Sequence, residues 1–312
     1  MDSSISPLFV TKFNSDKEFF KKTYPTGIRP QAKDIVRTWL YYTLLRCEKL
    51  TGETPWSEAW VMGYGLDEKG MKMSKSKGNA LDPLPIIEKF GADTFRFWSA
   101  SEVNHGYDFR CSEQKIESTK KFLSKLWNIS RSLSSFPIVE SDELTQTDKW
   151  IVSELDKLVK ECKKGLADYN FFIPAIAIRE FTWNIFAAHY IEMAKARAYG
   201  VDFSEKERNS AVHTLHKVLS TILKLLAPIT PFITDYLWQT LYSENSIHKE
   251  SQVVEETTED LSESTQKIIE FNSKVWNEKK AKSLSLKDSI DTKIPQELEL
   301  FSNDLTAMHN LK

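Results

Sequence analysis

The chain has 312 residues, which is enough to bury more than one core, so two or three domains are expected. A hydrophobic fraction of 41% and a net charge of -2 exclude disordered and collagen-like proteins. No apolar run approaches the roughly 18 residues needed to cross a bilayer, and no secretory signal is recognisable. We therefore expect no membrane partner and a cytoplasmic location.

The cysteines and histidines give no indication of a disulfide or metal site. Cys47, Cys111 and Cys162 are far apart and odd in number, so we interpret them as small buried side chains. His213 and His216 have no carboxylate or thiol at ligand spacing, so we interpret them as surface histidines of a helix and expect no metal. Because the net charge is near zero, RNA binding would depend on local basic patches.

The first 111 residues predict the closing half of an α/β unit. Residues 1–31 show no sustained period and are expected to be irregular. Apolar residues at three- and four-residue spacing predict a helix over 33–50, ended by Gly52. The apolar run over 58–62 predicts a buried strand, and residues 65–79, rich in glycine, lysine and serine, predict an exposed loop.

The remaining chain is predicted to be helical. Ser204 and Glu207 have the spacing of a capping box at the start of one long helix. Polar linkers are expected over 134–147 and 243–263. The predicted helices cover 83–89, 93–101, 112–133, 148–166, 173–199, 204–226, 232–241, 265–282 and 295–309. Their short connections predict an antiparallel bundle, and the expected domain limits are 1–111, 112–243 and 244–312.

The segment 72–79 is a concentrated cationic loop with three lysines within six positions. Gly70 and Gly78 flank it and allow its backbone to move. Lysine ammonium groups in such a loop suit a polyphosphate, because they offset the charge that develops on phosphoryl oxygens as pyrophosphate leaves. The alternative is a solvated surface turn, which lysine content alone would favour.

The literal string KMSKSKGN of this segment resembles the signature of class I aminoacyl-tRNA synthetases. Asp82 and Pro83 extend the match toward the valyl, isoleucyl and leucyl subgroup. The resemblance implies that Lys75 stabilises the transition state of amino-acid activation and that Lys72 assists with the triphosphate. It also implies that ATP with Mg2+ is a substrate and that the ATP-binding residues are Asp34, Lys72, Met73, Ser74, Lys75 and Ser76.

Two further segments identify the subgroup. Residues 91–98, which read GADTFRFW, resemble the family's "GADALR" helix behind the loop. Residues 29–39, which read RPQAKDIVRTW, resemble the segment "RPQGHDIIRTW" of valyl enzymes of archaeal type, with Ala32 where the family has glycine. The resemblance implies that Asp34 lies near the adenylate and that Ile35 and Trp39 line a valine pocket, which suits their i, i+4 spacing.

The helical part resembles the anticodon-binding domain of the same subgroup, which implies tRNA(Val) as a partner. Ser251, Gln252 and Val253 depart from the family there, because they replace a Ser-Trp-Pro sequence. The residues that contact tRNA are not evident from the sequence. The candidates, which we select because lysines contact phosphates, are Lys115, Lys121, Lys125, Lys160 and Lys164.

The family's His-Ile-Gly-His signature does not occur in this chain, and there is no room for the editing insertion. We therefore expect a monomeric chain that lacks the first catalytic half and does not act efficiently alone. The expected fold is the second half of a Rossmann-like domain followed by an α-helical anticodon-binding bundle. Three alternatives stay open: an isoleucyl-type fragment, a tRNA-binding module without catalysis, and a helical scaffold that docks another protein.

Overall fold

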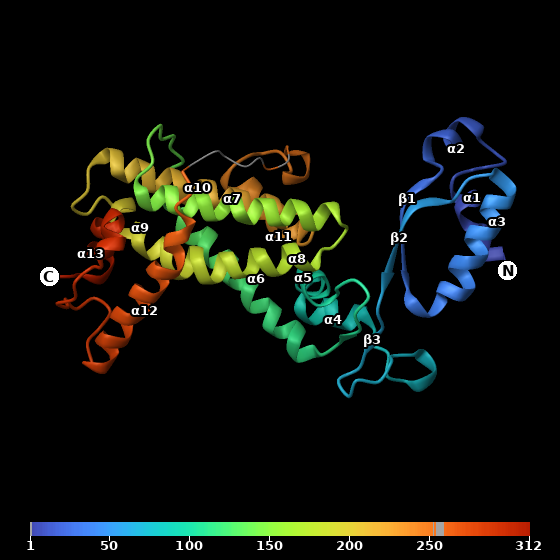
Figure 1. Ribbon diagram of the computed structural model, residues 1–312, viewed down its shortest axis with the longest axis horizontal. Coiled ribbons are helices and arrows are strands. Elements are labelled where there is room, and N and C mark those ends of the chain that lie inside the picture. The colour runs from blue at the N-terminus through green and yellow to red at the C-terminus, as the bar shows by residue number, and fades with distance from the viewer. Residues whose placement is uncertain (1, 252, 254–258) are drawn as a thin grey trace.

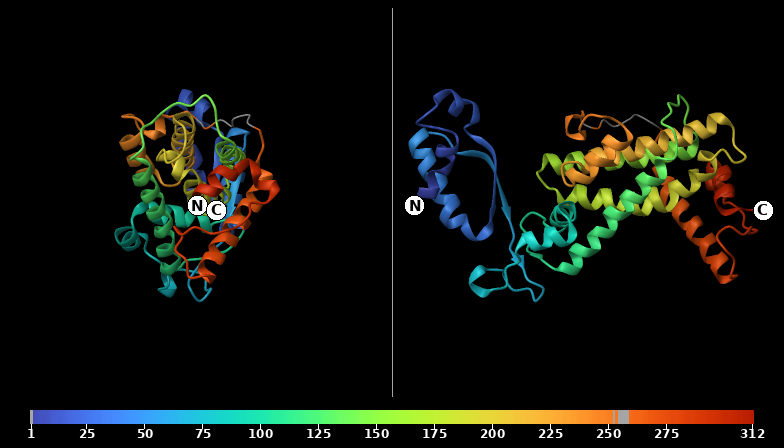
Figure 2. Two further views of the ribbon diagram at one scale, coloured as in Figure 1. Left: turned by 90° about the vertical axis from the view of Figure 1, so that its left-hand side faces the viewer. Right: turned by 180° about the vertical axis from the view of Figure 1, so that it is seen from behind.

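A computed structural model describes residues 2–251, 253 and 259–312 of the chain. The molecule is elongated, with its two termini at opposite ends, and is built largely of helices (Figures 1 and 2). Within these described ranges, no helix combines the length and the apolar character that a bilayer crossing requires. The expected fold class, an α/β portion followed by an α-helical bundle, is confirmed.

The N-terminal lobe is a βαβ unit with two short helices packed beside it (Figure 1). Strands β1 and β2 run parallel, with Thr26 opposite Trp56 and Ala32 opposite Met62. The connection between them ends where Gly52 adopts the left-handed conformation at φ +80°, which glycine adopts without steric cost. The elements are η1 (Asp2–Ile5), α1 (Ser6–Val10), α2 (Lys17–Thr23), β1 (Thr26–Ala32), η2 (Lys33–Ile35), η3 (Val36–Leu40), α3 (Tyr41–Thr51) and β2 (Trp56–Met62).

Two expectations for this lobe were wrong. Residues 1–31 are not irregular, because they hold two short helices and β1, none of them long enough to show a full amphipathic period. Residues 58–62 do form part of a strand, yet only Trp56 of β2 is buried. In the described residues β2 pairs with β1 alone. It therefore lacks the neighbouring strands and the helices on both faces that bury a central strand of a parallel sheet.

A small connecting region carries the lysine loop and joins the lobe to the bundle. Its two short strands pair in parallel, Gly65 with Phe109 and Leu66 with Arg110. Its core is a cluster of Ile86, Phe90, Trp98, Cys111 and Ile116. The elements are β3 (Gly65–Leu66), η4 (Lys75–Lys77), α4 (Pro83–Phe90), α5 (Ala92–Glu102) and β4 (Phe109–Arg110).

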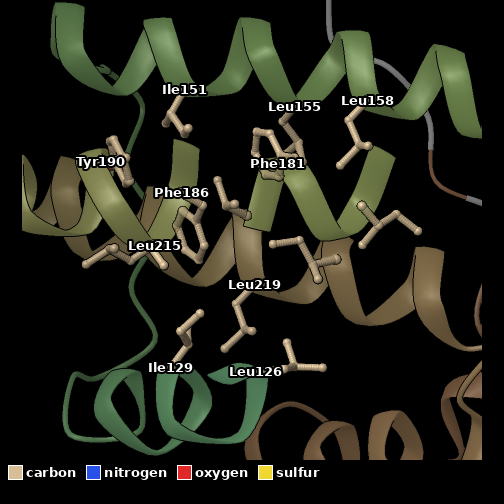
Figure 3. Packing of buried hydrophobic residues seen from close by; sticks show 14 of the residues in the cluster. Leu126, Ile129, Ile151, Leu155, Leu158, Phe181, Phe186, Tyr190, Leu215 and Leu219 are labelled. Atoms are coloured by element: carbon tan, nitrogen blue, oxygen red, sulfur yellow. The ribbon is translucent and has the colours of Figure 1, made fainter. Parts of the chain in front are cut away.

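The bundle holds the main hydrophobic core, in which facing helices interdigitate leucine, isoleucine and aromatic side chains (Figure 3). Ser204 and Glu207 form the expected capping box at the start of α10. The expected single helix over 173–199 contains a ten-residue π-helical segment, η5, in its middle. The elements are α6 (Glu113–Leu133), α7 (Gln146–Ala167), α8 (Phe172–Glu180), η5 (Phe181–Tyr190), α9 (Ile191–Ala198), α10 (Glu205–Leu226) and α11 (Pro231–Leu241).

The C-terminal segment folds back onto the far end of the bundle (Figure 1). A buried ionic network fixes it there: Arg197 of α9 forms ion pairs with Asp148 of α7, at 2.8 Å, and with Asp304 of α13, at 2.7 Å. Tyr190 and Ser210 also donate hydrogen bonds to Asp148. The elements are η6 (Ile247–Lys249), η7 (Ser262–Ser264), α12 (Thr265–Ala281), η8 (Gln296–Phe301) and α13 (Ser302–His309).

The cysteines are buried as expected, whereas one histidine expected at the surface is buried. Cys47, Cys111 and Cys162 are all buried and free. His216 is buried, with one ring nitrogen 3.1 Å from the Tyr242 hydroxyl and the other 3.2 Å from a backbone carbonyl, so the surface interpretation was wrong for this residue. Within the described part of the chain, no three His, Cys, Asp or Glu side chains are grouped to hold a metal ion.

Candidate functional site

The lysine loop between β3 and α4 is closed by two polar side chains at its base. The Asp67 carboxylate accepts hydrogen bonds from the backbone N–H of Met71, at 2.8 Å, and from the Asn79 amide, at 2.8 Å. The Asn79 side-chain oxygen in turn accepts a hydrogen bond from the Ser74 backbone N–H at 3.0 Å. These bonds bring the two ends of the loop together.

An ion pair joins the loop to the segment that follows β1. Lys72 Nζ lies 2.7 Å from Asp34 Oδ2 and 4.1 Å from the ring centre of Tyr64. Lys33 Nζ also lies near this ring, 4.4 Å from its centre, and 2.6 Å from Asp108 Oδ1. The structure therefore brings together Asp34 and Lys72, two of the residues selected from the sequence.

Each member of this pair holds the other in its charged form. The hydrogen bond from Lys72 lowers the pKa of Asp34, and the same bond raises the pKa of Lys72. Both side chains are partly exposed, so solvent and salt weaken their attraction. At neutral pH the pair is fully charged, and it breaks in acid, once Asp34 is protonated.

Removal of the carboxylate should make Lys72 more reactive. In Asp34→Asn the partner that raises the pKa of Lys72 is lost, so a larger fraction of its amine is neutral at pH 9 and nucleophilic. We expect competitive acetylation at pH 9, followed by mass spectrometry, to show faster labelling of Lys72 in the variant. Lys77 in the same loop is the internal control and should be labelled at an unchanged rate. Equal labelling of Lys72 in both proteins would contradict the ion pair.

The other loop residues contact one another and the core of the connecting region. Ser74 Oγ and Ser76 Oγ lie 3.2 Å apart. Met73 packs against the cluster that contains Trp98, so the loop is anchored in an apolar core. The backbone of Lys75 lies in η4, and its side chain lies outside the described residues.

Ile35 directly follows Asp34 in the η2 segment, and Trp39 lies in the next segment, η3. The Trp39 indole donates a hydrogen bond to the Ser3 carbonyl at 3.1 Å, and its ring lies 3.3 Å from the guanidinium carbon of Arg29. Ile35 is partly buried. The role of Ile35 and Trp39 toward valine stays a prediction.

A close backbone contact fixes the strand that leads into the loop. A Cβ atom added at Gly63 would lie 1.9 Å from the carbonyl oxygen of Tyr107, a separation that no side chain can occupy. The neighbouring residue Asp108 accepts a hydrogen bond from the Tyr64 backbone N–H at 2.7 Å. Glycine is therefore required at position 63 for β2 to approach the segment before β4.

Helix α5 joins the connecting region to the bundle through two charged side chains. Arg96 donates hydrogen bonds to the carbonyls of Ile229, at 2.8 Å, and Pro228, at 3.0 Å, just beyond the C-terminus of α10. Asp93 accepts from the backbone N–H of Ile233, at 2.6 Å, near the N-terminus of α11. Each charge lies at the helix end that favours its sign.

The candidate tRNA-binding lysines lie in different electrostatic surroundings. Lys115 forms an ion pair with Glu102 at 2.6 Å. Lys160 of α7 lies close enough to the carboxylate of Asp260 to lower its pKa. Lys121 and Lys125 instead line a groove on α6 together with Lys120. Lys164 is exposed on α7, and the structure does not gather the five candidates into one patch.

Several residues of the loop site were assigned no role from the sequence: Lys33, Tyr64, Asp67, Asn79 and Asp108. Asp67 and Asn79 are twelve positions apart and act as a pair only once the loop is closed. An aspartate three residues before Gly70 is a usual turn signal, and it could have indicated the role of Asp67. Lys33 and Asp108 are 75 positions apart, so no local pattern relates them.

Two family models match the chain. The model described as "tRNA synthetases class I (I, L, M and V)" matches residues 1–112, and the model described as "Anticodon-binding domain of tRNA ligase" matches residues 148–294. Residues 113–147, which include all of α6, lie between the two matches.

Similar proteins of known name include archaeal valine–tRNA ligases. The chain is 39% identical to that of Aeropyrum pernix, 41% to that of Pyrobaculum aerophilum and 38% to that of Nanoarchaeum equitans, over 99%, 99% and 100% of its own length. It spans only 39%, 40% and 41% of those relatives.

Among solved structures, the fold resembles two other synthetases. The Agrobacterium radiobacter K84 LeuRS complex with tRNA and LeuAMS matches with a TM-score of 0.66 and 18% identity, over 86% of this chain and 33% of that chain. The Mycobacterium tuberculosis methionyl-tRNA synthetase complex with methionyl-adenylate matches with a TM-score of 0.66 and 22% identity, over 76% and 48%. The chain therefore belongs to the class I aminoacyl-tRNA synthetase family, in which its relatives are valine–tRNA ligases.

Proposed function

We propose that this chain serves in the ATP-dependent activation of valine and its transfer to tRNA(Val), and that it contributes the lysine loop and the tRNA-binding bundle. The observation that carries the proposal is the contact between Lys72 and Asp34, at 2.7 Å. It places the cationic loop beside the segment that resembles the valyl adenylate site. A loop that served only as a solvated turn would need no such partner.

In the proposed reaction, a carboxylate oxygen of valine attacks the α-phosphorus of MgATP, and the bond to the pyrophosphate group breaks. Negative charge grows on the leaving pyrophosphate, and Lys72 and Lys75 offset it. Asp34 holds Lys72 until the phosphates replace the carboxylate as its partner. Ile35 and Trp39 contact the valine side chain, and a branched aliphatic residue beside an indole suits a small apolar group.

The proposed chemistry also needs groups beyond these 312 residues, which contain no His-Ile-Gly-His sequence. The described parallel sheet has two strands, and a sheet of this size needs further strands or helices against it to be stable. We propose that a catalytic half with the histidine signature docks on this lobe. The assembly would be cytoplasmic, with this chain present as a monomer.

Binding to tRNA(Val) and tRNA(Ile) across a salt series tests the proposal. We expect the purified chain to prefer tRNA(Val), with an affinity that falls as salt rises, because lysine–phosphate contacts release counterions. Fluorescence anisotropy with labelled transcripts measures both quantities. Equal affinity for the two tRNAs would refute valyl recognition by the bundle.

The same measurement separates the remaining alternatives. A preference for tRNA(Ile) would identify an isoleucyl-type chain. No binding to either tRNA would favour a helical scaffold that docks another protein. A tRNA-binding module without catalysis would bind tRNA in the same way, but its lysine loop would bind no polyphosphate, which titration with MgATP and pyrophosphate would reveal.

A further inference from the structure

Three segments of the chain meet in a buried polar cluster at the far end of the bundle, where the C-terminal segment folds back (Figure 1). The cluster consists of His189 of η5, Asn272 and Lys279 of α12, and His309, the last residue of α13. None of these four residues, which we call the histidine cluster, is more than 5% exposed. Because their polar side chains are removed from water, they must find their partners within the protein.

The Asn272 amide bridges the two histidine rings. Its Nδ2 lies 3.0 Å from Nδ1 of His189, and its Oδ1 lies 2.7 Å from Nε2 of His309. An amide N–H only donates and an amide oxygen only accepts, so Nδ1 of His189 accepts and Nε2 of His309 donates. Both rings satisfy these roles in the neutral state.

The bridge has no arrangement that accommodates two protonated rings. A protonated imidazole donates from both of its nitrogens, so His189 and His309 would each present an N–H to Asn272. The amide has one oxygen, and turning the amide round only moves the conflict from one ring to the other. Protonation of both rings therefore leaves a buried donor facing another donor, which weakens the contact between the three segments.

The charges around the cluster also oppose protonation. Lys279 Nζ donates to the carbonyls of Leu286, at 2.7 Å, and His309, at 2.8 Å, so a cation already lies beside the second histidine. Burial lowers the pKa of Lys279, and the charge of Asp288 acts in the opposite direction. Burial and the charges of Lys279 and His189 lower the pKa of His309 to about 4. Burial also lowers the pKa of His189.

The other charged groups of the helices packed here do not imitate this effect between pH 7 and pH 5. Burial raises the pKa of Asp304 on α13, so its protonation favours the folded state in acid. The pKa of Asp148 on α7 is lowered from 3.8 by its contact with Arg197 of α9, so its contribution is complete above that value. Glu192 and Lys195 of α9 pair with each other at the surface.

We propose that the histidine cluster is an acid-sensitive latch that holds the end of the chain on the bundle. At neutral pH both rings are uncharged, and Asn272 ties η5, α12 and α13 together. Released histidines bind protons at their ordinary pKa of 6.5, whereas His309 in the latch does so only at about 4. A fall in pH through this range therefore favours the state in which α13 has separated from α12 and η5.

Hydrogen exchange of the full chain, followed by mass spectrometry, tests the latch. The ratio of the intrinsic to the observed exchange rate gives a protection factor for each segment at each pH. We expect protection of 302–309 to fall at least about twentyfold between pH 7 and pH 5, the factor that His309 alone contributes. Helix α10 should stay more strongly protected than α13 at both pH values. Equal protection of the two helices at pH 5 would show that α13 leaves only when the whole bundle unfolds, and would overturn the proposal.

A variant that keeps the hydrogen bonds but does not titrate isolates the cause. In H189N/H309Q, the Asn oxygen replaces Nδ1 as acceptor, the Gln amide replaces Nε2 as donor, and neither side chain gains a proton. We expect protection of α13 in this variant to change less than about threefold between pH 7 and pH 5. H213Q removes a histidine of α10 that contacts the Val139 carbonyl outside the cluster. This matched control should retain the full wild-type change.

A measurement on the wild-type chain decides the question if the double variant does not fold. Long-range proton–nitrogen NMR spectra report the protonation of each histidine ring, and we expect the His309 ring of the folded chain to be neutral at pH 6. A ring that titrates near pH 6.5 in the folded chain would overturn the latch, as would a double variant with the wild-type pH dependence. Either result leaves the proposed function standing, because the lysine loop contains no residue of the cluster.

Discussion

Arg197→Ala should lower the free energy of unfolding by about 3–5 kcal/mol, because it leaves buried carboxylates without their cation. Arg197 is 1% exposed and contacts Asp148 through two parallel hydrogen bonds of 2.8 Å and Asp304 through one of 2.7 Å. Urea unfolding followed by circular dichroism at pH 7 measures the change. The far end of the bundle should loosen first, since Asp304 belongs to α13.

A nearby exposed ion pair provides the control. Lys195 lies on the same helix and contacts Glu192 at 3.3 Å, with both side chains about half exposed, so Lys195→Ala should cost well under 1 kcal/mol. Equal effects of the two substitutions would contradict the buried network as a source of stability.

The pH dependence of the Arg197 effect has a definite sign. Burial alone would raise the pKa of Asp148, but the Arg197 charge and hydrogen bonds from Arg197, Ser210 and Tyr190 together lower it. A carboxylate with a lowered pKa stabilises the fold above its unfolded pKa and loses that contribution as the pH falls. The difference in stability between wild type and Arg197→Ala should therefore shrink in acid.

The double variant Asp93→Ala/Arg96→Ala should uncouple the connecting region from the bundle, at a cost of about 2–3 kcal/mol. Asp93 is buried and caps the start of α11, and a lost cap of this kind costs about 1 kcal/mol. Arg96 provides two charge-assisted hydrogen bonds to carbonyls beyond α10, weakened by its exposure to solvent.

Calorimetry measures this uncoupling. We expect a single thermal transition to separate into two, because the lysine-loop region no longer unfolds with the bundle. Arg110→Ala is the control, since this arginine of β4 is exposed and its guanidinium lies near Gly70 of the lysine loop. A double variant that shows one transition at an unchanged temperature would contradict the view that these two α5 side chains couple the connecting region to the bundle.

The sequence was sufficient for the helices, the fold class and the family. Long amphipathic periods predicted α6, α7 and α10 to within two residues, because tertiary packing of one apolar face determines such helices. The literal string at 72–79 identified the family without any structural information. Both signals lie within short stretches of the chain, so they can be read from a single sequence.

Other features were beyond the reach of the sequence because they depend on distant residues. Strand β1 contains Gly27 and Pro30, which disfavour a strand, and its pairing with β2 overrides that preference. The burial of Arg197 depends on two carboxylates, 49 and 107 positions away.

For the site residues and the domain limits, too, one part is seen in the structure and the rest stays a prediction. The structure brings Asp34 and Lys72 together, and their roles toward ATP stay predictions. The roles of Lys75, Ile35 and Trp39 stay predictions, as do the limits at 111 and 243. The residue roles depend on a bound substrate, and the domain limits depend on which parts of the chain fold independently. The pattern of residues in a single sequence encodes neither property directly.

The open β1–β2 sheet has a practical consequence for work with this protein. A strand edge that lacks a partner exposes a row of backbone N–H and C=O groups to any extended peptide that approaches it. Glu58, the one charged residue of β2, is exposed and supplies a negative charge that discourages such pairing. Concentrated stocks would therefore be expected to remain monodisperse longest at low salt, where like charges on colliding edges repel one another most strongly.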